Sequence, residues 1–129
     1  VCQPYAHLLL LPNYDPERKR CENRTWNMKH RGMLAVHAGK SRKYMFAHDD
    51  RKWPELAYGA VAGTVEVVDC VALEDFPKWA AKHPAYDLMD HKHVEGPYCI
   101  IVKNPIRFAQ PVPYKGALGL WEWEAPCTE

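Results

Sequence analysis

The longest strand signal in the chain, Gly59 to Leu73, limits the fold more than any other stretch. It is rich in valine, and branched side chains favour a pleated, half-buried strand. Gly63 inside this run predicts a β-bulge or the close approach of another backbone. The two carboxylates in the run, Glu66 and Asp69, fit the solvent edge of a strand or a catalytic site at the mouth of a barrel. We therefore expect a fold built on a β-sheet.

Shorter strands and a few helices are expected around this run. Apolar runs and turn residues predict strands over Lys19–Trp26, Met33–Ala38, Pro97–Val102, Ile106–Val112 and Leu118–Glu124, and helices over Pro4–Leu11, Ser41–His48 and Glu74–Lys82. Pro111 and Pro113 restrict their strand to a sheet edge. Strands and helices do not alternate in a βαβ order, so we expect an α+β fold. Its expected form is a small, mostly antiparallel β-barrel flanked by two or three short helices, with Trp121 or Trp123 in the core.

Length and composition place the chain among globular proteins. Its 129 residues fit a single domain, residues 1–129, and 47% of them are hydrophobic. The five cysteines are odd in number and include no Cys-x-x-Cys pair, which favours a reducing, cytoplasmic location over a disulfide framework. No apolar run approaches the roughly 20 residues that span a bilayer, so no membrane partner is expected. The chain starts at Val1-Cys2 in what resembles the middle of a strand, and we expect a few native residues upstream.

The net charge of +1 hides an uneven distribution. Residues 1–52 hold eleven lysines and arginines against five acidic residues, whereas residues 53–129 hold six against eleven. This split predicts either one basic surface for an anionic partner or two halves that interleave in the fold and cancel. Lys40, Arg42 and Lys43 either extend such a surface or are simply solvated.

The densest group of candidate functional residues lies between Lys19 and Gly32. Residues two apart on a strand share a face, so Glu22, Arg24 and Trp26 would lie together, with Lys19 on the opposite face. An arginine fork clamps a phosphate or a base edge, and a tryptophan ring stacks a base with about 1–3 kcal/mol. The same residues also fit an exposed edge strand with solvated salt bridges.

The histidines are weaker candidates for functional residues than the Lys19–Gly32 stretch. His37 lies in an apolar run and is expected to be a hydrogen-bonded core residue. His91 and His93 are two residues apart with no cysteine at metal-binding spacing, which is weak evidence for a metal site. The chain contains no glycine-rich phosphate loop and no Gly-x-Ser-x-Gly motif. We expect neither a metal nor a cofactor.

Seven separated motifs occur in one order along nearly the whole chain. They are Gln3-Pro4-Tyr5-Ala6; Lys19-x-x-Glu22-x-Arg24-x-Trp26; His30-Arg31-Gly32 before the strand ending in His37-Ala38; Gly63-x-Val65 through Val68-Asp69-Cys70; Gly96-Pro97-Tyr98; Lys103-Asn104-Pro105; and Lys115-Gly116. Together they resemble the ASCH domain family of the PUA-like superfamily. The resemblance implies a PUA-like β-barrel with a cleft lined by a Gly-x-Lys-x-x-Glu-x-Arg signature, in which Glu17 here replaces the glycine.

The function that this resemblance implies is the binding of RNA or single-stranded nucleic acid in a basic cleft. The residues implied for binding are Gln3, Lys19, Glu22, Arg24, Trp26, Arg31, Lys103 and Asn104. The alternative is a hydrolase that acts on RNA or on a modified nucleoside with an N4-acetylcytidine-type amide, with Lys19 and Glu22 as catalytic residues. In the amidohydrolase branch a threonine nucleophile stands at the position of Glu22, so that mechanism is not carried over. A third hypothesis is a module that binds only protein.

Charge and motifs combine into one geometric expectation. If the chain binds a nucleic acid, Lys19, Arg24, Arg31 and Lys103 should lie on a single positive face. Lys19, Arg31 and Lys103 would hold phosphates there, because phosphate contacts position a nucleic acid without reading its sequence.

Overall fold

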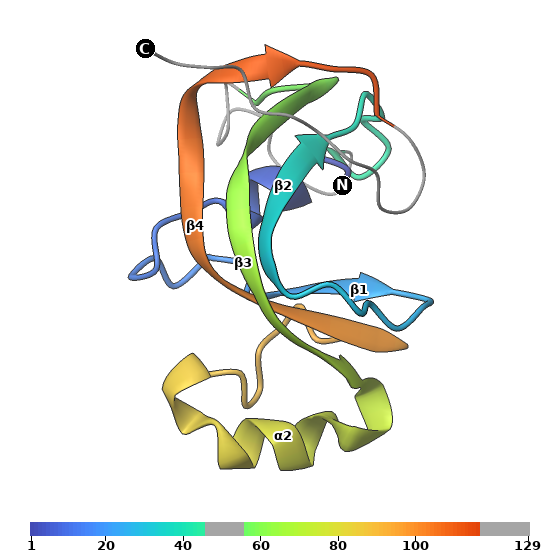
Figure 1. The fold of residues 1–129 in the computed structure, drawn as a ribbon, viewed down its shortest axis with the longest axis vertical. Helices are drawn as coiled ribbons and strands as arrows, with labels where there is room; N and C mark the ends of the chain where they lie inside the picture. The colour runs from blue at the N-terminus through green and yellow to red at the C-terminus, as the bar shows by residue number, and fades with distance from the viewer. Residues whose placement is uncertain (46–55, 117–129) are drawn as a thin grey trace.

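The computed structural model describes residues 1–45 and 56–116, which form a four-stranded antiparallel sheet with short helices (Figure 1). The strand order is β1-β4-β3-β2, so the two long strands lie in the middle of the sheet. The strands are β1 (Cys21–Arg24), β2 (Gly32–Ala38), β3 (Ala60–Ala72) and β4 (Tyr98–Pro113). The helices are α1 (Tyr5–Leu9) and α2 (Phe76–Lys82), with 3-10 turns η3 (Leu73–Asp75) and η4 (Pro84–Tyr86).

Each face of the sheet packs against its own helix. Neighbouring residues of a strand point to opposite faces, so β4 sends Ile100 and Val102 into the cluster with α1, and Ile101 into the cluster with α2. We call these two sides the α1 face and the α2 face. The core of the α1 face also contains Ala6, Leu9, Leu10, Met28, Val36, Ala38, Ala62, Val65 and Val67. The core of the α2 face also contains Cys21, Val71, Phe76, Ala80, Leu88 and Cys99.

The strand predicted around Gly63 is confirmed as β3, and so is the close backbone approach. A Cβ atom at Gly63 would lie 2.2 Å from the carbonyl oxygen of Ile106 on β4, so only glycine fits there. The β3–β4 register shifts on both sides of this point. The two strands bend sharply along their length (Figure 1), as expected where irregular pairing increases strand twist.

The α+β class and the mostly antiparallel sheet are confirmed, but the closed barrel is not. The described strands form an open sheet whose ends are β1 and β2. The predicted strand over 118–124, with Trp121 and Trp123, lies outside the described residues, as does the end of the helix predicted over 41–48. Residues 43–44 form a turn, and residues 41–42 have no regular secondary structure. Closure of the barrel therefore stays a prediction.

The turn predicted between two strands at residues 103–105 is wrong, because β4 runs through it as one strand. Asn104 takes a positive φ of 50° within β4, a conformation that asparagine tolerates better than most residues. The local kink keeps the strand paired with β3 on both sides of Asn104. The apolar segments on both sides of the turn-forming residues therefore join one strand.

Other sequence-based expectations concern cysteines, His37 and the membrane. Cys2, Cys21, Cys70 and Cys99 are free thiols. His37 is half-buried, and its Nε2 lies 2.6 Å from the carbonyl oxygen of Tyr114, which confirms a hydrogen-bonded histidine. Among residues 1–45 and 56–116, no helix has the length and apolar character needed to cross a bilayer.

Candidate functional site

Lys19, Glu22 and Arg24 form one hydrogen-bonded network on the α1 face, which we call the Glu22 site. The Lys19 backbone N–H donates to the Leu8 carbonyl at 2.9 Å, which fixes the residue beside α1 before β1 begins. Glu22 and Arg24 follow on β1, where alternate residues share a face. A short strand placed next to a short helix thus brings the three side chains together.

Both oxygens of the Glu22 carboxylate are occupied. The Lys19 Nζ donates to Oε1, and the Arg24 Nη2 donates to Oε2 at 2.8 Å. The Lys19 and Glu22 side chains are only 5% and 12% exposed, whereas that of Arg24 is 39% exposed. The Arg24 Nη1 also donates to the Asn23 carbonyl oxygen at 3.1 Å. The carboxylate therefore holds a guanidinium at the surface while neutralising the lysine underneath it.

An aromatic ring lies next to this network. The Lys19 Nζ is 5.0 Å from the centroid of the Tyr5 ring, within the range of a cation–π contact. The Tyr5 ring meets Tyr44 edge to face with centroids 5.4 Å apart, and His93 at 6.2 Å. Burial and the charge of Glu95 raise the pKa of Tyr5, so its phenol stays protonated and remains a hydrogen-bond donor.

The prediction that Lys19 faces away from Glu22 is wrong. It assumed a strand over Lys19–Trp26, but β1 covers only Cys21–Arg24, and Lys19 lies on the bend before it. The opposite side of β1 is structural: the Asn23 amide donates to the His93 carbonyl at 2.8 Å and accepts the Gly96 N–H at 2.8 Å. These bonds tie the irregular segment 93–96 to the strand.

Trp26 lies beyond the end of β1, so the strand predicted to include it stops at Arg24, although its side chain is on the same α1 face as Arg24. Its ring is partly buried against the hydrophobic core of the α1 face. The ring faces used in core packing are not free for a base. Tyr5 is the aromatic side chain that contacts the Glu22 site.

Arg31 belongs to a different network on the α2 face, which we call the Asp69 network. Its Nη2 lies 3.2 Å from Asp69 Oδ1, and its Nη1 donates to the carbonyls of Met28 at 2.7 Å and His30 at 3.0 Å. The other Asp69 oxygen accepts the indole N–H of Trp79, on α2, at 2.7 Å. The network fastens the loop before β2 to α2.

Lys103 and Asn104 lie around Glu66, the residue opposite Lys103 in the β3–β4 register. The Lys103 Nζ is 3.4 Å from Glu66 Oε2, and the Asn104 amide donates to the same oxygen at 3.4 Å. The hydrogen bond to Glu66 raises the pKa of the Lys103 ammonium. Lys103 alternates with Val102 of the α1 face, so it lies on the other side of the sheet from Arg24.

The prediction of one positive face is therefore wrong. Lys19 and Arg24 lie on the α1 face, while Lys103 points to the opposite side and Arg31 reaches Asp69 beside α2. Each of these four cations is also paired with a carboxylate. Whether any of them binds a nucleic acid stays a prediction.

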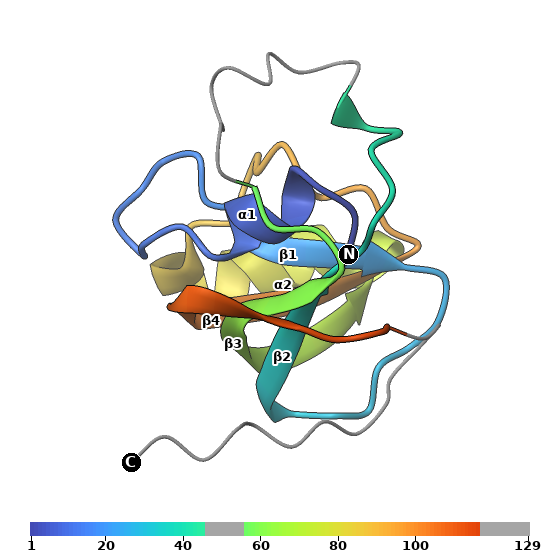
Figure 2. The ribbon, with the colours of Figure 1, turned by 90° about the horizontal axis from the view of Figure 1, so that it is seen from above.

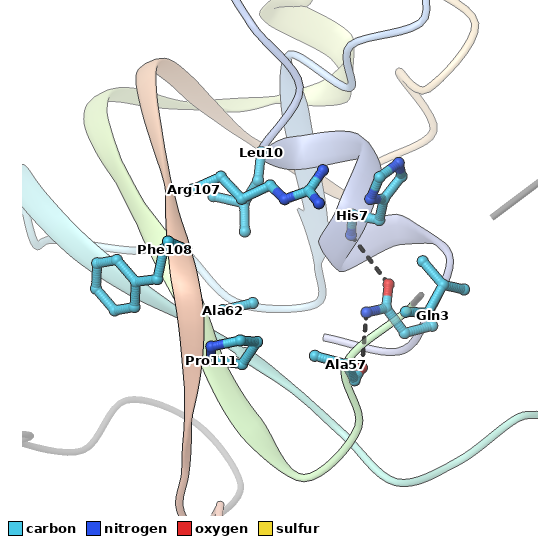
Figure 3. A pocket seen from close by; sticks show the side chains of 10 residues that line it. Gln3, His7, Leu10, Ala57, Ala62, Arg107, Phe108 and Pro111 are labelled. Carbon is cyan, nitrogen blue, oxygen red and sulfur yellow. Dashed lines mark hydrogen bonds between the residues drawn. The ribbon is translucent and has the colours of Figure 1, made fainter. Parts of the chain in front are cut away.

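Gln3, another predicted binding residue, is only 1% exposed and uses its amide inside the fold. Its Nε2 donates to the Ala57 carbonyl at 2.8 Å, and its Oε1 accepts the His7 backbone N–H at 3.0 Å. A small cavity of about 150 Å³ adjoins these bonds (Figure 3). In Figure 3 the guanidinium of Arg107, from β4, points toward His7 across α1.

This cavity is a weaker candidate site than the Glu22 site. Drug-sized ligands occupy pockets of about 300–1,000 Å³, whereas a cavity of about 150 Å³ has room for a molecule about the size of benzene. Burial and the nearby Arg107 charge lower the pKa of His7, which favours the neutral imidazole. Of its lining residues, Gln3 stands in the Gln3-Pro4-Tyr5-Ala6 motif, whereas the others come from α1 and the residue after it, residues 56–57 and both long strands, which no single motif joins.

The segment around His91 makes internal contacts as well. The Arg20 backbone N–H donates to His91 Nε2 at 3.1 Å, and burial together with His93 and Arg20 lowers the pKa of His91 to about 4. Arg18, which the sequence-based list missed, is 7% exposed and donates to the Val102 carbonyl at 3.4 Å. Over the described parts of the chain, no three His, Cys, Asp or Glu side chains cluster in a way that could hold a metal ion.

Comparison with known proteins places this site in a family. The model of the ASCH domain matches residues 2–112, nearly the whole chain. This chain belongs to the ASCH domain family. No curated protein matched the sequence. The matched range contains α1, β1 to β3, β4 up to its last residue, and both networks, so the Glu22 site is part of the family's domain and not an addition to it.

The sequence did contain a signal for the one site residue that was missed, Tyr5. It stands in the Gln3-Pro4-Tyr5-Ala6 motif and within the helix predicted over Pro4–Leu11, but it is not among the predicted binding residues. Its contact with Lys19 depends on how α1 docks beside β1. Tyr5 and Lys19 are 14 positions apart in the sequence, and hydrophobic periodicity alone cannot predict a contact between them.

Proposed function

We propose that this ASCH domain binds single-stranded nucleic acid, RNA in the first place, and that the Glu22 site receives a base. The observation that carries this proposal is the Arg24 guanidinium, 39% exposed and fixed by Glu22, whose other partner, Lys19, lies over the Tyr5 ring. A guanidinium held in one orientation loses little entropy when it binds a base edge or a phosphate. The Tyr5 ring, which contacts Lys19 of the same network, can stack a base.

The charge balance of the site also supports a base more than a chain of phosphates. Glu22 compensates Lys19, so the network has a net charge of about one positive unit. Nucleic-acid binding by phosphate contacts alone needs several uncompensated cations. Hydrogen bonding and stacking to an unpaired base need only the fixed donors and the ring.

The experiment is a titration of fluorescently labelled single-stranded RNA with the wild type, Arg24→Ala and Arg31→Ala. Both variants lose one arginine that is paired with a carboxylate, one on each face of the sheet. We expect Arg24→Ala to bind at least about tenfold more weakly, from the usual value of a hydrogen bond to a charged group, and Arg31→Ala to bind like the wild type. Equal affinity of all three proteins would disprove a base site at Glu22.

A hydrolase is the second candidate, and the burial of Lys19 against Glu22 is the observation that favours it. A buried lysine beside a carboxylate is a common arrangement in catalytic proton transfer. However, an ammonium that donates to a carboxylate has no lone pair with which to accept a proton, so Lys19 in this geometry is a donor. Release of acetate from N4-acetylcytidine, lost in Glu22→Gln while nucleoside binding survives, would establish this alternative.

A further inference from the structure

Three cations follow the end of β2 and belong to neither network. Lys40, Arg42 and Lys43 are exposed and occupy four consecutive positions with Ser41. Within residues 1–45 and 56–116, no carboxylate forms an ion pair with any of the three. They contrast with Lys19, whose charge Glu22 compensates, and their positive charge is available to an external anion.

Aromatic rings position two of these cations without neutralising them. The Arg42 guanidinium lies 4.0 Å from the centroid of the Tyr58 ring, and the Lys43 Nζ lies 5.0 Å from that of Tyr44. These are cation–π distances, and Arg more than Lys uses such rings as a platform. The guanidinium and the ammonium are therefore presented on the surface with their N–H donors directed at solvent or a ligand.

The basic segment adjoins the Glu22 site through a continuous line of contacts. Lys43 lies over Tyr44, Tyr44 meets Tyr5 with ring centroids 5.4 Å apart, and Tyr5 receives the Lys19 ammonium at 5.0 Å. Figure 2 shows residues 39–45, in teal, leaving β2 next to the chain end that leads into α1. A ligand seated at Arg24 could thus continue over Tyr44 onto Lys43.

We infer that Lys40, Arg42 and Lys43 form the phosphate-binding surface of this protein, and that they hold the backbone of the nucleotides next to the base at the Glu22 site. The partner is a single-stranded nucleic acid at least a few nucleotides long. Such strands are bound by cations that follow the backbone combined with aromatic rings on which bases stack, which is the composition of this surface. The inference rests on the proposed function, since it assigns a second part of the same ligand.

The inference reassigns the phosphate contacts expected from the sequence. Arg31 and Lys103 are already paired with Asp69 and Glu66 on the other side of the sheet. A phosphate could recruit them only by displacing a carboxylate. A phosphate can bind Arg42 and Lys43 without displacing a carboxylate. We therefore expect the contacts of these two residues to account for the counterions that the nucleic acid releases on binding.

The test compares two double variants that change the net charge equally. One is Arg42→Gln with Lys43→Gln, and the matched control is Lys78→Gln with Lys82→Gln, two exposed lysines on α2. Affinity for a labelled RNA hexamer and for a single nucleoside is measured at several salt concentrations. Thermal unfolding of each variant checks the fold, and Lys43→Gln alone serves if the double variant is destabilised.

We expect the Arg42/Lys43 variant to lose roughly 20-fold in hexamer affinity at 0.1 M salt, and its plot of log affinity against log salt to become less steep by about 1.4. Lys43→Gln alone should change that slope by about 0.7. Nucleoside binding should stay at the wild-type value, because a nucleoside carries no phosphate. The α2 control should bind both ligands like the wild type.

Three outcomes overturn the inference, and they are distinguishable. If the wild type binds neither ligand, the proposed function fails and the phosphate surface with it. If the wild type binds the hexamer but the Arg42/Lys43 variant matches the α2 control in affinity and salt slope, the base site stands and the phosphate surface is wrong. If the variant loses nucleoside and hexamer affinity equally, these residues act on the base.

Discussion

The Glu22 site and the Asp69 network contain the same kinds of residue but differ in how the carboxylate is used. Asp69 accepts from Arg31, from the backbone N–H of Cys70 at 2.8 Å and from the indole of Trp79. All three donors belong to different segments of the chain. The carboxylate thus connects a loop, a strand and a helix, which is a structural task.

Glu22 instead connects residues that are already neighbours in sequence. It accepts from Lys19, three residues before it, and from Arg24, two residues after it. Such local bonds contribute little to joining distant segments, but they orient a guanidinium that is 39% exposed. The range of a carboxylate's partners therefore separates an ion pair that joins distant segments from one that orients an exposed guanidinium, although the residue types are the same.

The largest expected effect concerns Lys19, because it is the most buried member of either network. Lys19→Met leaves the Glu22 carboxylate 12% exposed without the ammonium, so the free energy of unfolding should fall by about 3 kcal/mol. Urea denaturation measures it. In the double variant Lys19→Met, Glu22→Leu, most of that loss should be recovered, since the carboxylate oxygen that lost its ammonium partner is removed as well. A single variant as stable as the wild type would contradict the role of Lys19 as the partner of a buried charge.

Asp69→Ala tests whether the Asp69 network stabilises the fold without taking part in RNA binding. Three donors lose their acceptor, and we expect the free energy of unfolding to fall by about 2 kcal/mol, a total reduced by the partial exposure of the site. RNA affinity of the folded variant should equal that of the wild type, because Asp69 lies on the α2 face. Weaker RNA binding with unchanged stability would reverse the assignment of the two networks.

Tyr5→Leu tests whether the aromatic ring at the Glu22 site contributes to RNA affinity. The change keeps an apolar side chain on α1 but removes the ring that Lys19 and Tyr44 contact, so RNA affinity should fall by about five- to tenfold through the loss of stacking. Trp26→Leu is the matched control, because Trp26 packs on the core and should alter stability more than affinity. Anisotropy titration and urea denaturation of both variants separate the two effects.

The last expected effect is a pH dependence from His91, which belongs to neither network. Its pKa is lowered to about 4 in the folded protein from 6.5, mainly by burial, so below pH 6.5 the unfolded chain binds a proton that the folded chain does not. Stability should therefore fall as the pH drops from about 6.5 to about 4. His91→Gln keeps an acceptor for the Arg20 N–H but cannot titrate, and urea denaturation at pH 7 and pH 5 should show a smaller loss for this variant.

Much of the fold could be predicted because it depends on local patterns. The valine-rich run correctly predicted β3, and Gly63 predicted the close approach of another backbone, which is that of β4. The amphipathic segment 74–82 correctly predicted the helical region that contains η3 and α2. Boundaries were less predictable: β1 is shorter than its strand signal, and β4 passes through residues that favour turns. Pairing with β3 on both sides of Asn104 outweighs the local preference for a turn.

The sequence by itself determined the family, the β-sheet and the shared face of Glu22 and Arg24, since motifs and hydrophobic patterns are properties of neighbouring residues. Only the tertiary structure decided which cations are compensated. Ion pairs such as Arg31–Asp69 and Lys103–Glu66 join residues 37 or more positions apart, and no local pattern encodes them. The same holds for Tyr5, which reaches Lys19 only because α1 docks beside β1. Charge counted along the chain therefore marked the basic residues, while side-chain packing decided which of them stay available to a ligand.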